Sequence, residues 1–301
     1  MLVRGTVTDA ATGKPIAGAK AMAAGALLWD PETPRVTTGD GGTFAVAVPP
    51  GSRGHVLVKG PNNDYVTSEI TYGELAGGKR SGGRNYADAI IPFEAKAGTE
   101  TLDVTAQVRR GVTVRGTLLG PGDKPVADAL MICWKQEDSW LSGSIWVGVP
   151  VRDGVFELRG CDPEVTYPVS FLDAKNKLGA TAHLSAREAA GKEVTVRLEP
   201  CGSAVVRFVD KEGKPRKGFR ATPFMVIRPE DKGAGPESDF LVNFDRVNYR
   251  GAGLTADAEG RCTMPVLIPG ATYFFAGYPK PLLTVKSGET LKRDVVIEPP
   301  Q

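Results

Sequence analysis

The chain has 301 residues, with 37 Lys and Arg against 35 Asp and Glu, so its formal net charge is +2 at pH 7. No basic stripe stands out, which argues against nucleic acid as a partner, and no apolar run approaches the roughly 18 residues of a membrane-spanning helix. Hydrophobic residues form 41% of the chain, which is enough for ordinary cores and argues against disorder. With 37 Gly and 23 Pro, we expect many short strands rather than helices.

The first residues bear on cellular location. Met1 to Arg4 leads directly into the first expected strand, so we expect no signal peptide in this chain. The chain is then either a cytoplasmic protein or a piece of a longer exported one.

One short pattern occurs three times. Each copy has a strand, a polar turn with a Lys-Pro pair, and the start of a second strand. The first strands are expected at 3–9, 114–119 and 205–210, and the Lys-Pro pairs lie at 14–15, 124–125 and 214–215. A repeat of roughly 95 residues with about seven strands is typical of one β-sandwich per copy.

The later parts of the copies also match. A turn and the start of a strand recur at 41–46, 153–158 and 257–262. In the second and third copies, Pro163 and Pro269 precede Tyr167 and Tyr273 by the same four residues. Residues 60–86 depart from this plan, and we expect loops there, with a mobile glycine-rich tip at 77–84.

The pattern therefore predicts an all-β fold of three tandem, seven-stranded Greek-key β-sandwich domains, of the prealbumin-like or Ig-like kind. Their expected boundaries are 1–110, 111–200 and 201–301, and we expect each domain to close around its own core. Because only a residue or two separates them, the array is expected to be a rod with limited bending.

These marks resemble the carboxypeptidase regulatory-like domain, a transthyretin-like (prealbumin-type) β-sandwich. The shared pattern is Gly-Thr-Val-x-Asp, then Gly-Lys-Pro-(Val/Ile)-Ala, an Asp-Gly-x-Phe strand and a Pro-Gly-x-x-Tyr turn. The third copy is degenerate, because Val206 replaces the glycine and Cys262 stands where Phe44 and Phe156 stand. The resemblance implies a spacer, folding partner or binding module, often at a bacterial cell surface, and so favours an extracellular or periplasmic location.

Related β-sandwich families include enzymes, but their sites are not matched. The segment 129–134 resembles intradiol dioxygenases, whose iron is held by two Tyr and two His. Only His55 and His183 are present, in different copies. Tyr249-Arg250-Gly251 resembles the tail of hydroxyisourate hydrolases, but it is internal and lacks the partner histidines. The segment that accompanies Lys-Asn isopeptide bonds in collagen-adhesin B-type domains is absent. We therefore expect no enzyme, no catalytic residues and no cofactor.

Three of the four tryptophans, Trp134, Trp140 and Trp146, lie within thirteen residues of the second copy. Exposed flat rings could stack on sugars, which makes these three the candidate ligand-binding residues. The alternative is that Trp134 and Trp146 face the core, because tryptophan buries a large area. Trp140 is then the one expected to be exposed.

The cysteines and repeated aspartates allow further sites. Cys161 and Cys201 both lie in turn-like surroundings, so a disulfide between them is possible if their backbones approach closely. Cys133 and Cys262 lie in apolar runs and are expected as buried thiols. The aspartates before glycines, Asp40, Asp153 and Asp257, are expected to serve turns rather than calcium, which needs six to eight oxygens. No metal site is expected.

Together these observations predict a non-catalytic structural or protein-interaction array, part of a larger or cell-surface protein. Its partner is a protein or a glycan, and the chain itself is expected to be a monomer. The alternative is a carbohydrate-binding module that uses exposed aromatic residues of the middle domain.

Overall fold

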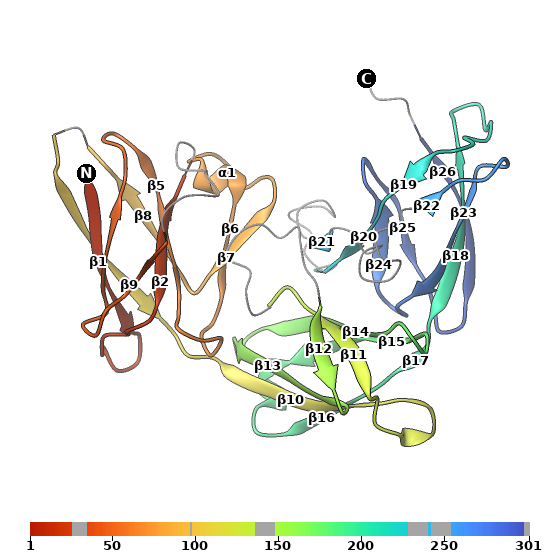
Figure 1. Cartoon of the computed structure of the whole chain (residues 1–301), viewed down its shortest axis with the longest axis horizontal. Coiled ribbons are helices and arrows are strands. Elements are labelled where there is room, and N and C mark those ends of the chain that lie inside the picture. The colour runs from red at the N-terminus through yellow and green to blue at the C-terminus, as the bar shows by residue number, and fades with distance from the viewer. Residues whose placement is uncertain (26–34, 97, 136–147, 228–239, 242–253, 298–301) are drawn as a thin grey trace.

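The computed structural model describes residues 1–25, 35–96, 98–135, 148–227, 240–241 and 254–297 (Figure 1). In these residues the fold is all-β: strands form nearly all of the regular structure, and each helical segment is only three or four residues long. None of these helices is long and apolar enough to cross a membrane. Strand pairing stays within three consecutive stretches of the chain, at 2–108, 112–200 and 202–296.

The first stretch has a three-stranded sheet of order β4-β1-β9 and a four-stranded sheet of order β3-β2-β5-β8. Apolar side chains of both sheets, among them Val3, Phe44 and Val56, meet in a buried core between them. The strands are β1 (Leu2–Asp9), β2 (Lys20–Ala24), β3 (Val36–Thr37), β4 (Thr43–Ala47), β5 (Arg53–Lys59), β8 (Ala89–Glu94) and β9 (Thr101–Val108).

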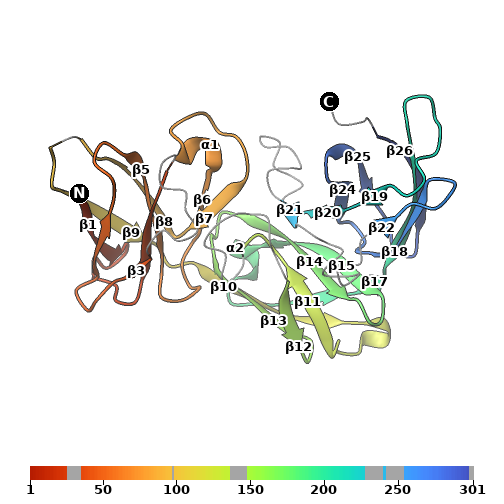
Figure 2. The same cartoon turned by 45° about the horizontal axis from the view of Figure 1, so that its top comes forward.

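The second stretch forms one continuous eight-stranded sheet, of order β16-β10-β13-β12-β11-β14-β15-β17. Its strands are β10 (Val112–Leu119), β11 (Asp128–Ile132), β12 (Val149–Arg152), β13 (Val155–Cys161), β14 (Thr166–Asp173), β15 (Leu178–Ser185), β16 (Glu193–Arg197) and β17 (Glu199–Pro200). It also has a 3₁₀ turn, η1 (Pro121–Asp123), and a short helix, α2 (Ala186–Ala189), which Figure 2 shows near β10.

The third stretch has sheets of order β23-β18-β26 and β21-β20-β24-β25 and a two-stranded pair, β19-β22. Its strands are β18 (Gly202–Val209), β19 (Arg220–Ala221), β20 (Pro223–Val226), β21 (Phe240–Leu241), β22 (Leu254–Thr255), β23 (Arg261–Leu267), β24 (Thr272–Phe275), β25 (Tyr278–Thr284) and β26 (Thr290–Val296).

The three stretches share one strand plan. In each, the first strand pairs antiparallel with the strand after the Asp-Gly turn and parallel with the closing strand: β1 with β4 and β9, β10 with β13 and β16, and β18 with β23 and β26. The repeated Lys-Pro pair has the same place each time, since Pro15, Pro125 and Pro215 each form a bridge to the first strand. The repeat in the sequence is therefore a repeat of strand pairing.

The repeated Pro-to-Tyr step also has a physical cause. The Tyr167 hydroxyl accepts a hydrogen bond from the backbone N–H of Asp162, just before Pro163, at 2.8 Å. The Tyr273 hydroxyl accepts the equivalent bond from Ile268, also at 2.8 Å. Both rings are buried, and each hydroxyl pairs a backbone donor that is buried at Ile268 and partly buried at Asp162; leaving such a donor unpaired would be costly.

The pairing of the first strand also explains the glycine that the sequence pattern repeats there. A Cβ on Gly5 would lie 2.4 Å from the Phe44 ring, so the glycine leaves room for that ring. Gly5 and Phe44 are cross-strand partners, and in the third stretch the corresponding partners are Val206 and Cys262. The two departures of the third copy are therefore one exchange, in which a larger residue on one strand is matched by a smaller one opposite.

Residues 60–86 are more ordered than the sequence predicts. They contain β6 (Ser68–Thr71), α1 (Tyr72–Leu75) and, ending just beyond, β7 (Arg84–Ala87). Ile70, Leu75 and Ala87 pack with Met22 and Leu57 in a small separate core. The expectation of loops throughout this segment is wrong because these apolar side chains cover the second face of the β2-β5 sheet.

The cores of the second and third stretches run together. Gly179 of β15 is the contact point, where a Cβ would lie 3.2 Å from the Cys201 sulfur and 3.3 Å from the Ile268 side chain. The buried residues of both stretches form one contiguous cluster, which also includes Tyr86 of the first stretch; the other buried residues of the first stretch form clusters of their own. That each stretch folds autonomously within the predicted boundaries stays a prediction. Figure 1 also shows the first and third stretches flanking the second, so the expected rod is bent.

Candidate functional site

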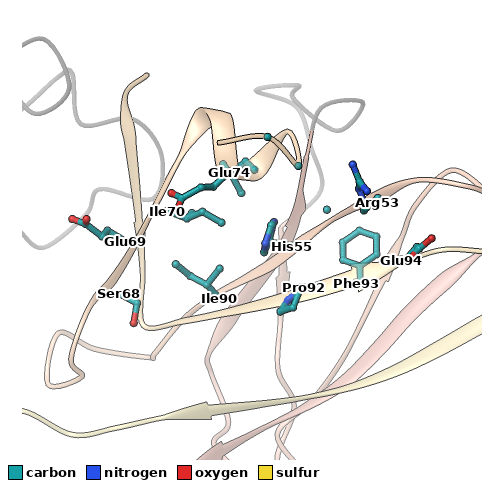
Figure 3. A pocket seen from close by; sticks show the side chains of 14 residues that line it. Arg53, His55, Ser68, Glu69, Ile70, Glu74, Ile90, Pro92, Phe93 and Glu94 are labelled. Carbon is teal, nitrogen blue, oxygen red and sulfur yellow. The ribbon is translucent and has the colours of Figure 1, made fainter. Parts of the chain in front are cut away.

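A groove of about 840 Å³ lies in the first stretch. Strands β5 and β8 form its floor, and β6 and α1 form one wall (Figure 3). It exists because the inserted segment 60–86 packs on the outer face of the sheet. The labelled lining side chains are Arg53, His55, Ser68, Glu69, Ile70, Glu74, Ile90, Pro92, Phe93 and Glu94.

His55 lies at the centre of the groove floor, on β5 opposite Pro92 of β8. Its Nδ1 atom is buried and has no hydrogen-bond partner among the described residues. Burial lowers the pKa of His55, and the charge of Glu74 acts in the opposite direction. A neutral imidazole is therefore favoured, and the groove has no nucleophile joined to a base through Nδ1.

Glu74 is held in the groove wall by a capping box at the start of α1. Its carboxylate accepts hydrogen bonds from the backbone N–H and the hydroxyl of Thr71, at 2.9 and 2.8 Å. These two bonds lower the pKa of Glu74, so its negative charge is stabilised. Glu69 is engaged differently, in ion pairs with Arg80 and Arg84. Both carboxylates of the wall are therefore held by neighbouring groups.

A second group of contacts, here called the joint, connects the first and second stretches. The Lys135 ammonium, buried just after β11, donates hydrogen bonds to the Tyr65 carbonyl at 2.8 Å and the Thr67 hydroxyl at 2.7 Å. Burial and the nearby Lys59 charge lower the pKa of Lys135 to about 8, while Asp88 acts to raise it. A lysine amine of the second stretch thus caps backbone and side-chain acceptors of the first.

The polar groups of the first stretch at this joint form one network. Asp88 accepts hydrogen bonds from the Gly60 backbone at 2.8 Å and from the Thr67 hydroxyl at 3.1 Å. It also pairs with Lys59, with Nζ and Oδ1 3.4 Å apart, and both side chains are buried. Because every oxygen of Asp88 has a partner, its charge is compensated in the interior.

The backbone connection is paired on both sides. Val66 donates to the Arg109 carbonyl and Gly111 to the Asp64 carbonyl, each at 2.8 Å. On β13, Gly160 has φ +63°, and a Cβ there would lie 2.4 Å from the Tyr65 carbonyl oxygen. Only glycine fits both that conformation and that close approach.

Trp134 belongs to this joint. Its ring stacks on Tyr86 of the first stretch at 5.5 Å and on Tyr167 of the second at 5.2 Å between ring centroids. With 6% of the residue exposed, Trp134 has no open face for a sugar, which corrects its assignment as a ligand-binding residue. Trp140 and Trp146 lie outside the described residues.

The disulfide considered possible between Cys161 and Cys201 is not formed, because all four cysteines are free thiols. Cys161 pairs with Val112 at the start of β10, whereas Leu198, three residues before Cys201, is hydrogen-bonded to Leu119 at its end. A strand of eight residues spans on the order of 24 Å, and three residues cannot return far enough for a disulfide, which needs Cα atoms within about 7 Å. Burial raises the pKa of Cys161 to about 12.

The other predicted residues lie apart. The Asp257 carboxylate accepts backbone N–H bonds from Glu259 and Arg261, at 3.0 and 2.7 Å, which is turn chemistry. Among the described residues, no group of three or more His, Cys, Asp or Glu side chains could hold a metal. His55 and His183 lie in different sheets.

The sequence alone did not reveal the joint or the groove. Lys135 follows a tryptophan at the end of an apolar run, and nothing local marks it as buried. The one usable signal was Tyr65 and Tyr86, two aromatic residues in a segment otherwise read as loop.

Comparison with known proteins gives weak likenesses only. No family model matches the chain, and no curated protein matches it in sequence. A Bacillus anthracis protein called TIE is 16% identical with a TM-score of 0.26; the match covers 98% of this chain, which spans only 50% of that one. A shaft pilin, SpaA of Lactobacillus rhamnosus GG, is 14% identical with a TM-score of 0.27, over 66% of this chain and 96% of that one. BcpA, the major pilin subunit of Bacillus cereus, is 10% identical with a TM-score of 0.21, over 98% and 99%. Scores this low establish no shared family.

Proposed function

We propose that the chain is a non-catalytic structural element whose first two domains act as one stiff body. The observation that supports this is the joint, where Lys135, Trp134 and Gly160 of the second domain are each fitted to groups of the first. Flexible linkers between independent domains have exposed, poorly paired backbone. Here the connecting backbone is paired, and a buried amine and an aromatic stack cross the boundary.

The joint buries polar groups at a cost in free energy, which supports a role in fixing the relative orientation of the two domains. Burying an ammonium group is costly unless it is fully hydrogen-bonded. Polar groups of this kind fix one arrangement more than they add stability, because a displaced domain would leave the Lys135 amine and the Tyr65 carbonyl unpaired. A structural array needs its domains to keep one relative orientation.

The resemblance to carboxypeptidase regulatory-like domains supports a place outside the cytoplasm, and we include that location in the proposal. Protease treatment of intact cells that make the protein tests it: cleavage without lysis is expected. Full protection until lysis would place the chain inside.

Urea unfolding followed by hydrogen exchange and mass spectrometry tests the stiff body. We expect amides of β9 and β10 to lose protection at the same urea concentration, and Trp134→Ala to separate the two transitions. Val155→Ala, which changes an exposed residue of the same domain, is the matched control and should leave them together. Separate transitions in the unmodified protein would refute the proposal.

A further inference from the structure

The outer face of the β23-β18-β26 sheet, in the third stretch, carries a hollow of about 460 Å³. It lies far along the chain from both the groove and the joint. Its lining residues are Val205, Arg207, Arg261, Lys292, Arg293 and Asp294. Arg207, Arg261 and Lys292 share the outer face with a single carboxylate, whereas Arg293 is in register with the buried Val206 and so projects from the other face of the sheet.

Two of these cations oppose each other directly. Arg207 of β18 and Arg261 of β23 are cross-strand partners in the antiparallel register. Like charges at such positions destabilise a sheet. Arg207 has partial relief from Asp294, with Nη1 and Oδ2 3.5 Å apart. Arg261, Lys292 and Arg293 have no ion-pair partner within the described part of the chain.

The repeat supplies internal controls. Because Gly5, Gly116 and Val206 are equivalent, Thr6 and Thr117 occupy the place of Arg207, and their antiparallel partners are Thr43 and Val155. Two residues earlier along these strands, where the third stretch has Val205, Arg4 pairs with Asp103 at 3.3 Å and Arg115 pairs with Glu157 at 2.8 Å. The first two copies thus have uncharged residues on both strands at this position, and only the third opposes arginine with arginine.

We propose that this hollow binds a ligand carrying at least two phosphate groups. A bound dianion removes the repulsion between Arg207 and Arg261, which explains a pair that costs stability in its absence. Two guanidinium groups present up to about ten N–H donors, more than the two oxygens of one carboxylate can accept. A phosphate offers three or more oxygens and nearly two negative charges at pH 7.

Lys292 indicates more than one phosphate. Lys292 is paired in register with Val205, two residues along β18 from Arg207. That separation is about 7 Å along the strand, so one phosphate on the arginine pair leaves the lysine free for a second. No aromatic ring lines the hollow, which disfavours single-stranded nucleic acid because its bases stack on such rings.

Calorimetric titration of the full chain with inorganic tripolyphosphate at low salt tests the site. We expect binding that weakens at least tenfold in Arg261→Glu, which creates a cross-strand Arg–Glu pair of the kind found at Arg115 and Glu157. Lys14→Glu makes the same charge change on an exposed turn of the first stretch, and it should bind like the unmodified protein. Lys292→Gln should weaken binding of tripolyphosphate more than binding of orthophosphate.

The same variants separate a site from general attraction. Because Arg261→Glu removes a repulsive pair, it should unfold at a higher temperature than the unmodified protein while binding less. Binding within twofold of the unmodified protein in Arg261→Glu, or an equal loss in Lys14→Glu, would overturn the proposal. Equal affinity for a short poly-glutamate peptide would overturn the assignment to phosphate.

Discussion

The pairing of Gly5 with Phe44 permits a quantitative test of the shared strand plan. Gly5→Val places a Cβ 2.4 Å from the Phe44 ring and 2.9 Å from a Val104 methyl. Overpacking of this kind costs about 1–3 kcal/mol. Phe44→Cys alone removes a buried ring and costs about 3 kcal/mol. Together they recreate the Val206–Cys262 pair of the third stretch.

The double variant should therefore be less destabilised than the sum of the single variants, by about 1–3 kcal/mol. That difference is the coupling energy of residues in contact. The lower end of this range allows for Val104: its methyl group still lies 2.9 Å from the new Cβ in the double variant and has to shift, so part of the strain remains.

Hydrogen exchange of β1 amides at increasing urea concentration measures these energies in the first stretch of the full chain. Gly39→Val is the matched control, since a Cβ on Gly39 has no neighbour within 4 Å, and its cost should add simply to that of Phe44→Cys. If the costs of Gly5→Val and Phe44→Cys were also additive, the exchange would not be compensatory and the reasoning would fail.

Three further predictions concern the joint and the tyrosine hydrogen bonds. The pKa of Lys135 is about 8 in the folded chain, against 10.5 for an ordinary lysine. Between these two pH values the folded chain has released the proton and the unfolded chain still holds it, so unfolding takes up a proton. The free energy of unfolding therefore rises with pH over this interval, by on the order of 3 kcal/mol. Lys135→Met should remove that rise in urea titrations at pH 7 to 10, and an unchanged pH profile would contradict it. Gly160→Ala should lower the free energy of unfolding by more than about 1 kcal/mol, because the positive φ strains an alanine and its Cβ collides with the Tyr65 carbonyl oxygen. Calorimetry measures the unfolding midpoint, and an unaltered midpoint would contradict this prediction. Tyr167→Phe should cost about 1–3 kcal/mol by leaving the Asp162 N–H unpaired, and faster exchange of that amide is the measurement; unaltered exchange would count against the bond.

The sequence predicted the strands well where the repeat was clear. Strand, Lys-Pro turn and closing strand recur with their pairing, because alternating burial and fixed turns determine register locally. The Gly-to-Val and Phe-to-Cys departures were visible at Val206 and Cys262, but only the register shows that they face each other.

The candidate sites could not be predicted in the same way. Trp134 could be identified as a candidate from its aromatic ring, but its partner Tyr86 belongs to another stretch. The periodicity of residues within a strand does not predict how two domains are placed relative to each other. Lys135 illustrates the same limit, because a lysine is normally exposed. Residues 60–86 were misread as loops because β6 and α1 have only four residues each, so isolated apolar residues such as Ile70 and Leu75 form no recognisable periodic pattern.

The most direct test of the stiff joint is the distance distribution between the first two domains. Spin labels at Thr12 and Lys192, both exposed, can be introduced in a Cys201→Ser background and measured by pulsed electron spin resonance. We predict one narrow distribution in the otherwise unmodified chain and a broad one in Trp134→Ala. A distribution that is broad before Trp134 is changed would contradict the account.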